Sequence, residues 1–157
     1  MALLLGSSGY LLLHSEGKLL LIGDPGAVHH TIAPIWRTAN FGNGTTTVSW
    51  PSPLDPSELK NYSIDCSVEM DGIGSRISTV QVSLSPLAVT AGLMIYGVTN
   101  DATFVTVWFM VDPLEREKLN WNPPGEVHTI TCTVTSMDGE VFERTIGLTI
   151  RQLGQTT

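Results

Sequence analysis

Few residues of this 157-residue sequence could do chemistry, and the two cysteines are the first to consider. Cys66 and Cys132 both lie where apolar residues alternate with polar ones, which is typical of strands with one buried face. If the two thiols face the same core, a disulfide would close a loop of about 66 residues and stabilise the fold by about 4 kcal/mol. Free buried thiols are the alternative, and the residues alone leave both open.

A metal site is the second chemistry to consider, because the chain has four histidines: His14, His29, His30 and His128. Adjacent histidines in an extended segment point to opposite sides, and no cysteine or carboxylate follows them at a ligand spacing. The Asp-Gly segments at 71–74 and 138–139 lack the alternating acidic residues of a calcium loop, so we interpret them as turns. We predict neither a metal nor another cofactor.

Catalysis is disfavoured, because the sequence contains no nucleophile elbow, phosphate-binding glycine loop or paired-carboxylate motif. The aromatic residues offer a different function, since tryptophans can stack on sugars. The four tryptophans are spread over four segments: Trp36, Trp50, Trp108 and Trp121. That spacing favours roles in the core or as interface anchors over a sugar-binding platform.

Composition and charge exclude several partners. The net charge is −7, and the eight basic residues are scattered, whereas nucleic-acid binding requires clustered Lys and Arg. Charged residues make up only 15% of the chain, against roughly a quarter in ordinary domains, which indicates a largely covered surface. No apolar run approaches a membrane span, and the first nine residues lack the basic start of a signal peptide. We therefore expect a soluble protein made in the cytoplasm, with neither nucleic acid nor membrane as a partner.

Among the predicted secondary-structure elements, the most informative feature is a pair of leucine triplets near the N-terminus, at 11–13 and 19–21. They flank a turn and predict a β-hairpin. Because side chains alternate along a strand, each triplet places leucine on both faces, so the hairpin needs cover on both sides. An isolated hairpin is at best marginally stable in water. We infer an assembly arm whose partner-binding residues are Leu11, Leu12, Leu13, Leu19, Leu20, Leu21 and Ile22.

The chain divides into two parts on this interpretation. Residues 1–44 form the hairpin arm and an irregular connector, with a break at 41–44, and residues 45–157 form a second domain. About seven strands are predicted there, with turns at the spacing of a β-sandwich. The expected strands are 45–50, 62–68, 77–84, 93–98, 104–111, 127–135 and 141–150.

The predicted fold class is all-β, an immunoglobulin-like antiparallel sandwich with an N-terminal hairpin arm. Asp138-Gly139 suits a type I′ turn and makes the last two strands neighbours. Helix is nearly absent, except that Asp112 can cap one or two turns over 112–119. The expected core residues are Ile64, Cys66, Val68, Ile130, Cys132, Val134, Ile146, Leu148 and Ile150.

Three features together resemble a known family. They are Trp50-Pro51 with the Pro-Leu-Asp-Pro turn, the strand 62–66 followed by Asp71-Gly72, and the closing hairpin 129–146. This pattern, over about Trp50 to Arg151, resembles the small immunoglobulin-like virion proteins of tailed bacteriophages often labelled fiber-tail adaptor proteins. The sequence departs from it at Cys66, where an aromatic residue is expected, and at 104–121, which replaces a shorter segment.

The resemblance implies a non-enzymatic structural protein that joins tail fibers to the tail, made in the host cytoplasm and located in the virion, on the tail or capsid surface. Its partners would be tail, fiber or capsid subunits, and a homo-oligomer is the default. A reducing cytoplasm favours free thiols at Cys66 and Cys132. A capsid decoration or cement protein is an alternative in the same class. A carbohydrate-binding module for host adsorption is the other, and it requires an exposed platform including Trp108 or Trp121.

Overall fold

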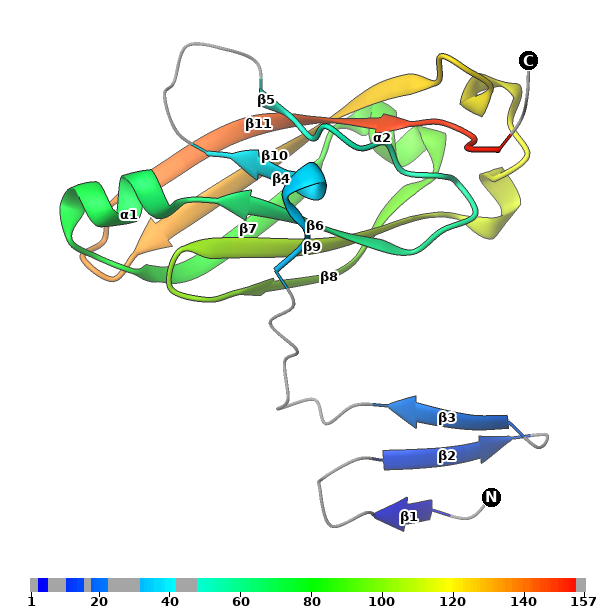
Figure 1. Ribbon diagram of the computed structural model, residues 1–157, viewed down its shortest axis with the longest axis horizontal. Coiled ribbons are helices and arrows are strands. Elements are labelled where there is room, and N and C mark those ends of the chain that lie inside the picture. Colours follow the sequence, from blue (N-terminus) through cyan, green and yellow to red (C-terminus); the bar gives the residue numbers. More distant parts are fainter. Residues whose placement is uncertain (1–2, 6–10, 16–17, 23–31, 42–47, 155–157) are drawn as a thin grey trace.

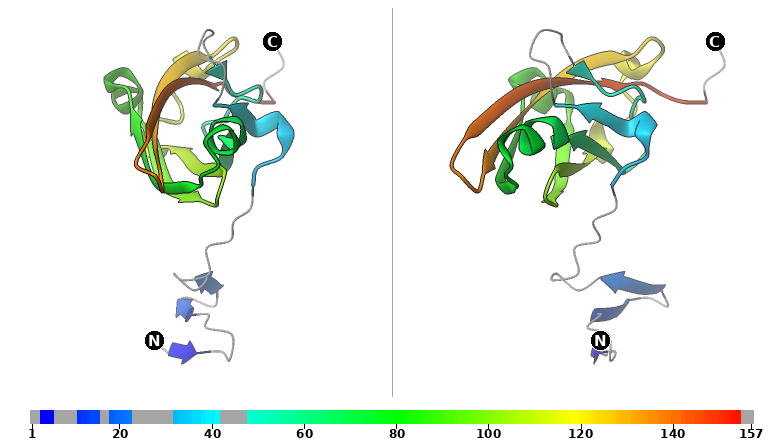
Figure 2. Two further views of the ribbon diagram at one scale, coloured as in Figure 1. Left: turned by 90° about the vertical axis from the view of Figure 1, so that its left-hand side faces the viewer. Right: turned by 60° about the vertical axis from the view of Figure 1, so that its left-hand side comes forward.

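The fold is mostly β, two four-stranded mixed sheets packed as a sandwich, in a computed structural model that describes residues 3–5, 11–15, 18–22, 32–41 and 48–154 (Figure 1). An end-on view shows the sheets as two layers with the core between them (Figure 2). The predicted β-sandwich is therefore confirmed. Its sheets are not purely antiparallel, because each has one edge strand in a parallel pair.

The first sheet has the strand order β4-β6-β9-β8. Its strands are β4 (Thr38–Asn40), β6 (Lys60–Asp65), β9 (Phe104–Val111) and β8 (Leu93–Asn100). Strand β4 runs parallel to β6, and the other neighbours are antiparallel. A bulge between Ile95 and Gly97 interrupts the β8–β9 register, so edge strand β8 is bent at its middle.

The second sheet has the order β5-β11-β10-β7. Its strands are β5 (Val48–Ser49), β11 (Val141–Ile150), β10 (Glu126–Ser136) and β7 (Ile77–Leu84). The hairpin predicted from Asp138-Gly139 is confirmed, but its turn is not of type I′. The Ser136 amide donates to the Glu140 carbonyl and the Gly139 amide donates to the Ser136 carbonyl, so residues 137–139 form a three-residue loop with Gly139 at φ 89°.

The core lies between the sheets and follows the period of two in each strand. Trp50 fixes one end of it, because its indole Nε1 donates a 2.8 Å hydrogen bond to the carbonyl oxygen of Ser63 and its ring packs edge-on against Tyr62 and Phe109. Eight of the predicted core residues are fully buried: Ile64, Cys66, Ile130, Cys132, Val134, Ile146, Leu148 and Ile150. Val68 was predicted wrongly, since 66% of it is exposed.

Val68 is exposed because the predicted strand ends at Asp65 and a helix, α1 (Ser67–Ile73), follows. The turn predicted at 71–74 is therefore the end of that helix, where Gly74 adopts φ 64°. The other helical segments are α2 (Pro86–Ala91) and three 3-10 turns, η1 (Ile35–Arg37), η2 (Pro113–Glu115) and η3 (Leu119–Trp121). The Asp112 cap is confirmed, because its carboxylate accepts a hydrogen bond from the Leu114 amide.

Residues 32–41 belong to the sandwich, although the sequence suggested an irregular connector through Asn40. Ala39 and Phe41 are buried in the core, and β4 pairs with β6. Arg144 ties this segment to β11, because its Nε donates to the Phe41 carbonyl and its guanidinium lies 5.2 Å from the centre of the Phe41 ring. The predicted domain boundary at 44–45 lies outside the described residues.

The N-terminal segment forms a sheet of its own with the order β1-β2-β3. Its strands are β1 (Leu3–Leu5), β2 (Leu11–Ser15) and β3 (Lys18–Ile22). The predicted hairpin is β2–β3, and β1 adds a third strand that the sequence analysis did not predict.

Candidate functional site

The leucine-rich sheet β1–β3, called the leucine sheet below, contains all seven predicted partner-binding residues. In the β2–β3 register Leu11 pairs with Ile22, Leu12 with Leu21, and Leu13 with Leu20. Leu19 pairs with His14. The structure thus brings the two triplets onto adjacent strands. What their side chains contact lies outside the described residues.

Strand β1 extends the same pattern by one strand. Leu3, Leu4 and Leu5 pair with Leu13, Leu12 and Leu11 in turn, so leucine lies opposite leucine along this whole ladder. Three consecutive leucines in a strand occupy both faces of a sheet. The signal for β1 was in the sequence, since Leu3–Leu5 is a third triplet of the same kind.

A second apolar surface lies on the sandwich itself, on the face of the first sheet that points away from the core. Because Leu93, Ile95 and Phe109 are directed inward, Met94, Met110 and their neighbours lie on the outer side. Met94 pairs with Met110, and Gly97 pairs with Trp108. A Cβ placed on Gly97 would be 4.0 Å from the Trp108 ring, which puts the indole beside the bulge.

The first described residues of the sandwich cross this same outer side. The amide of Ala33 donates a 2.8 Å hydrogen bond to the Ser63 hydroxyl, which is 3.0 Å from the Thr106 hydroxyl. Both hydroxyls are buried although they point away from the core. The crossing segment covers them, and it continues into η1, where Ile35 and Trp36 are exposed.

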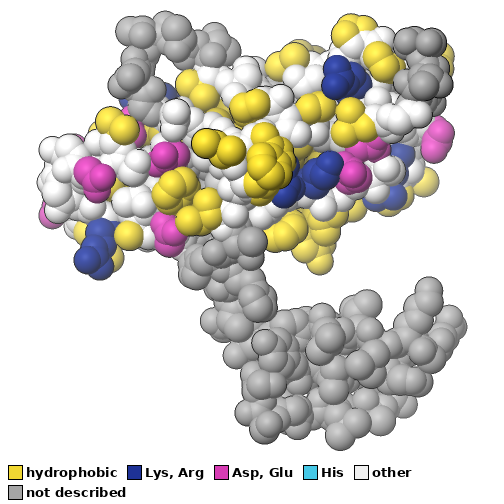
Figure 3. Space-filling model, in the orientation of Figure 1, with side chains coloured by type: hydrophobic (Ala, Val, Ile, Leu, Met, Phe, Trp, Pro, Cys, Tyr) yellow, Lys and Arg dark blue, Asp and Glu magenta, His cyan; other side chains and the backbone are white. Residues whose placement is uncertain are grey.

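We call the surface formed by Ile35, Trp36, Met94, Tyr96, Trp108 and Met110 the outer face. Trp36 is 62% exposed and Tyr96 is 68% exposed, large fractions for aromatic side chains. Hydrophobic side chains gather around η1 and toward β8 in the space-filling view (Figure 3). Strands β8 and β9 contain no charged residue, so nothing ionic interrupts this part of the sheet. Exposed apolar surfaces that are large and contiguous are typical of interaction sites in soluble proteins.

The sequence analysis did not identify the outer face, although a signal for it was present. Strand β8 begins with Leu93, Met94, Ile95 and Tyr96, four large apolar residues in succession. Apolar and polar residues alternate in a strand that has one face in contact with water, whereas the first four residues of β8 are apolar on both sides. The same argument that singled out the leucine triplets applies here.

The structure separates the tryptophans into two pairs. Trp50 and Trp121 are buried in the core, and Trp121 donates from its Nε1 to the Glu115 carbonyl at 2.7 Å. Trp121 therefore cannot belong to an exposed sugar-binding platform, which leaves Trp108 as the residue on which that alternative depends. Trp36 and Trp108 are the remaining pair.

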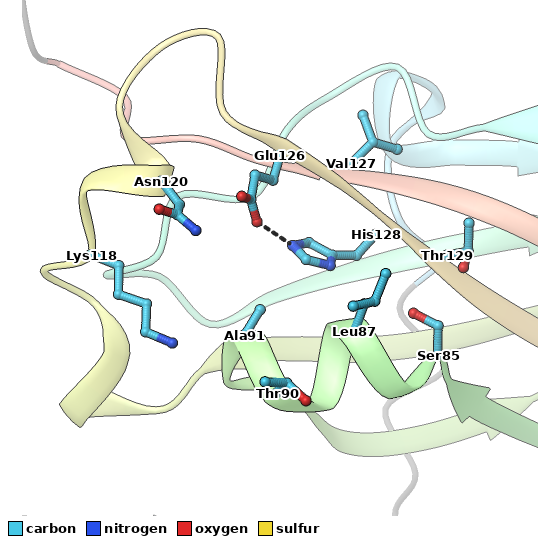
Figure 4. A pocket seen from close by; sticks show the side chains of 10 residues that line it. All are labelled: Ser85, Leu87, Thr90, Ala91, Lys118, Asn120, Glu126, Val127, His128 and Thr129. Atoms are coloured by element: carbon cyan, nitrogen blue, oxygen red, sulfur yellow. Dashed lines mark ion pairs between the residues drawn. The ribbon is translucent and has the colours of Figure 1, made fainter.

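A hollow of about 550 Å³ lies between α2, β10 and the segment around η3. Its lining includes His128 and Glu126 from β10, with Lys118 and Asn120 across the opening (Figure 4). The Nε2 atom of His128 lies 3.3 Å from a Glu126 carboxylate oxygen. Burial lowers the pKa of His128, and Glu126 opposes that effect only in part, so the imidazole is neutral at pH 7.

The polar groups of this hollow are largely engaged within the protein. Lys118 forms an ion pair with Glu115. The Ser85 hydroxyl accepts from the Ala88 amide as the cap of α2, and the Thr90 hydroxyl donates to the Pro86 carbonyl. These contacts account for the side chains without a ligand, so the hollow does not carry a functional assignment.

Cys66 and Cys132 are free thiols, both buried, as favoured above for a reducing compartment. Burial raises the pKa of both thiols, that of Cys132 to about 12. A protonated buried thiol is a poor nucleophile. The two cysteines therefore act as small core residues.

No protein-family model matches the sequence, and a search of the curated proteins returned no match. Within the described residues, no helix has the length and apolarity needed to cross a bilayer.

Proposed function

We propose that this chain is a non-enzymatic bacteriophage virion structural protein of the fiber-tail adaptor type, which joins tail fibers to the tail through its N-terminal arm and β-sandwich. The observation that carries the proposal is the leucine sheet, in which triplets at 3–5, 11–13 and 19–21 lie on three paired strands. A sheet with leucine on both faces is stable only when other apolar surfaces cover it. An assembly partner supplies such a surface.

The strand order supports the immunoglobulin-like part of the proposal. In an immunoglobulin sandwich, strands A, B, E and D form one sheet, and C, F and G form the other. The order β4-β6-β9-β8 corresponds to the first set, and β7-β10-β11 corresponds to the second. Cys66 directly after β6 and Cys132 on β10 then fall at the B and F strands. The parallel direction of β4 differs from that scheme.

Apolar burial by the arm contributes favourable free energy to assembly. Burying six leucines at up to about 2 kcal/mol each gives on the order of 10 kcal/mol before costs. Ordering a short hairpin costs about 1–2 kcal/mol of conformational entropy per residue. Strand pairing within the leucine sheet offsets part of that cost. Affinity for a partner then comes from apolar burial and is insensitive to salt.

Deletion of residues 1–22 tests the proposal in the virion. In complementation of a phage that lacks this protein, we expect the deleted chain to fold but to be absent from purified particles. A matched control is Leu114→Asp, which adds a charge at a leucine that is 90% exposed on the sandwich and should be incorporated normally. Normal incorporation of the chain that lacks residues 1–22 would contradict the proposal.

Position and copy number distinguish an adaptor from a capsid decoration protein, the alternative within the same class. An adaptor is expected at the tail in the low copy number set by tail symmetry, whereas a decoration protein is present at every capsomer. Quantitative mass spectrometry of purified tails and capsids measures both.

A further inference from the structure

The outer face is an exposed apolar surface that lies on the side of the first sheet away from the core. Met94, Tyr96 and Trp108 lie on uncharged strands, and β8 is an edge strand with one unpaired side. Natural edge strands are usually protected by lysine, proline or a covering segment. Strand β8 contains neither lysine nor proline, and its bulge lies between Ile95 and Gly97. Its side chains Met94 and Tyr96 are exposed on the outer face, and we interpret this face as a surface for a partner.

The leucine sheet of the same chain is an apolar element that matches the outer face. The described segment that begins at Ile32 lies against the outer side of β6, because the Ala33 amide donates a hydrogen bond to the Ser63 hydroxyl. The nine residues 23–31 connect β3 to this point and can span at most about 30 Å. The leucine sheet is therefore tethered within reach of the outer face.

One copy of the outer face covers only one side of the leucine sheet. The triplets place leucine on both sides, so a second apolar surface is required. A second copy of this chain supplies an identical one. Because the net charge is −7, two copies repel each other except where their contact is uncharged, and β8 and β9 meet that condition.

We propose that the protein forms a two-fold homodimer in which the leucine sheets lie between the two outer faces, each contacting the outer face of the other copy. This inference rests on the proposed function, because it names the partner of the same assembly arm. Such an interface is isologous, as expected for a two-fold pair, with Met94, Tyr96 and Trp108 as its sandwich-side contacts. Aromatic residues and methionine are the types enriched in interface cores.

The first test places charges on the outer face of the full chain and measures mass by light scattering. The wild-type chain is expected at twice 17.0 kDa, and Met94→Lys/Tyr96→Lys at the mass of one copy. The matched control is Leu87→Lys/Leu114→Lys, which changes two leucines that are 78% and 90% exposed on other elements and should leave the dimer intact. A dimer that survives the Met94/Tyr96 substitutions overturns the proposal.

A mixing experiment then separates exchange between copies from docking of the arm on its own sandwich. The chain lacking residues 1–22 offers an outer face without an arm, and the Met94→Lys/Tyr96→Lys chain offers an arm without an acceptor face. Each alone is expected to be monomeric, and their mixture should form a heterodimer. Failure to associate overturns the exchange of arms.

The two proposals fail in different ways. If wild-type protein is monomeric at all concentrations but needs its arm for incorporation into particles, the homodimer is wrong and the assembly function stands. If the homodimer forms but incorporation does not need the arm, the function is wrong and the dimer stands.

Discussion

At the scale of single residues, two polar side chains, Asp55 and Trp50, form hydrogen bonds that also fix the position of apolar neighbours. Asp55 accepts hydrogen bonds from the amides of Ser57 and Leu153, which joins the chain after β11 to the loop before β6. The Trp50 indole is held in the same way by the Ser63 carbonyl. Leaving such a carbonyl unpaired costs about 1–3 kcal/mol, so these bonds help select one arrangement of the core.

His128 makes stability depend on pH in a defined direction. Burial lowers its pKa below the ordinary value of about 6.5, so the unfolded chain binds a proton that the folded chain does not. The free energy of unfolding should therefore fall as pH drops below about 6.5, by at most about 1.4 kcal/mol per pH unit, and level off below the folded-state pKa.

Chemical denaturation of wild type and His128→Gln between pH 7.5 and 5.5 measures this effect. The variant removes the titrating group, so its stability should be nearly constant across that window while wild type loses stability. Parallel curves for the two proteins would contradict the assignment of a neutral buried imidazole.

At the scale of elements, the strands were largely predictable and the helices were not. Strands β7, β9 and β11 begin and end where the sequence patterns placed them, because apolar alternation and Asp-Gly turns are local signals. Helix α1 was missed because Ile64, Cys66 and Val68 continue the period of two beyond the end of β6. Only the backbone of Cys66, at φ −102° and ψ 12°, turns the chain into the helix.

Helix α2 was missed although its signals were present. Ser85 is its cap, Pro86 is its first residue and Gly92 follows its end at φ 95°, which is the expected order for a short helix. Strand β4 had no local signal, because it is three residues long and depends on pairing with β6. The two parts of the candidate site show the same contrast between local and long-range signals. The leucine strands follow from a local pattern, whereas the outer face depends on which side of β8 and β9 the core occupies.

The β10–β11 turn and α1 provide a matched pair of glycine substitutions. Gly139 has φ 89° and open space around its Cα, so Gly139→Ala isolates the backbone cost and should destabilise the sandwich by about 1–2 kcal/mol. Gly72 lies within α1, also in open space, and Gly72→Ala should stabilise by about 0.5–1 kcal/mol. Thermal unfolding of both variants measures whether each substitution lowers or raises the stability of the fold. A stability gain for Gly139→Ala would mean that the turn does not have this conformation.

At the scale of the whole molecule, the chain combines the sandwich with a leucine sheet whose described strands pair only with one another. The described core of the sandwich is built from residues between 39 and 150, and we predict that the sandwich folds without residues 1–22. The leucine sheet is the opposite case, since three short strands with leucine on both faces require cover. This asymmetry is the basis of the assembly function proposed here.

The most direct test of this account is the mass in solution of the full chain and of the chain lacking residues 1–22, measured by light scattering with circular dichroism as the control for folding. We expect the full chain at twice 17.0 kDa and the truncated chain as a folded monomer with the same β-rich spectrum. An unchanged oligomer after truncation, or a truncated chain that no longer folds, would contradict the separation of arm and sandwich on which the account depends.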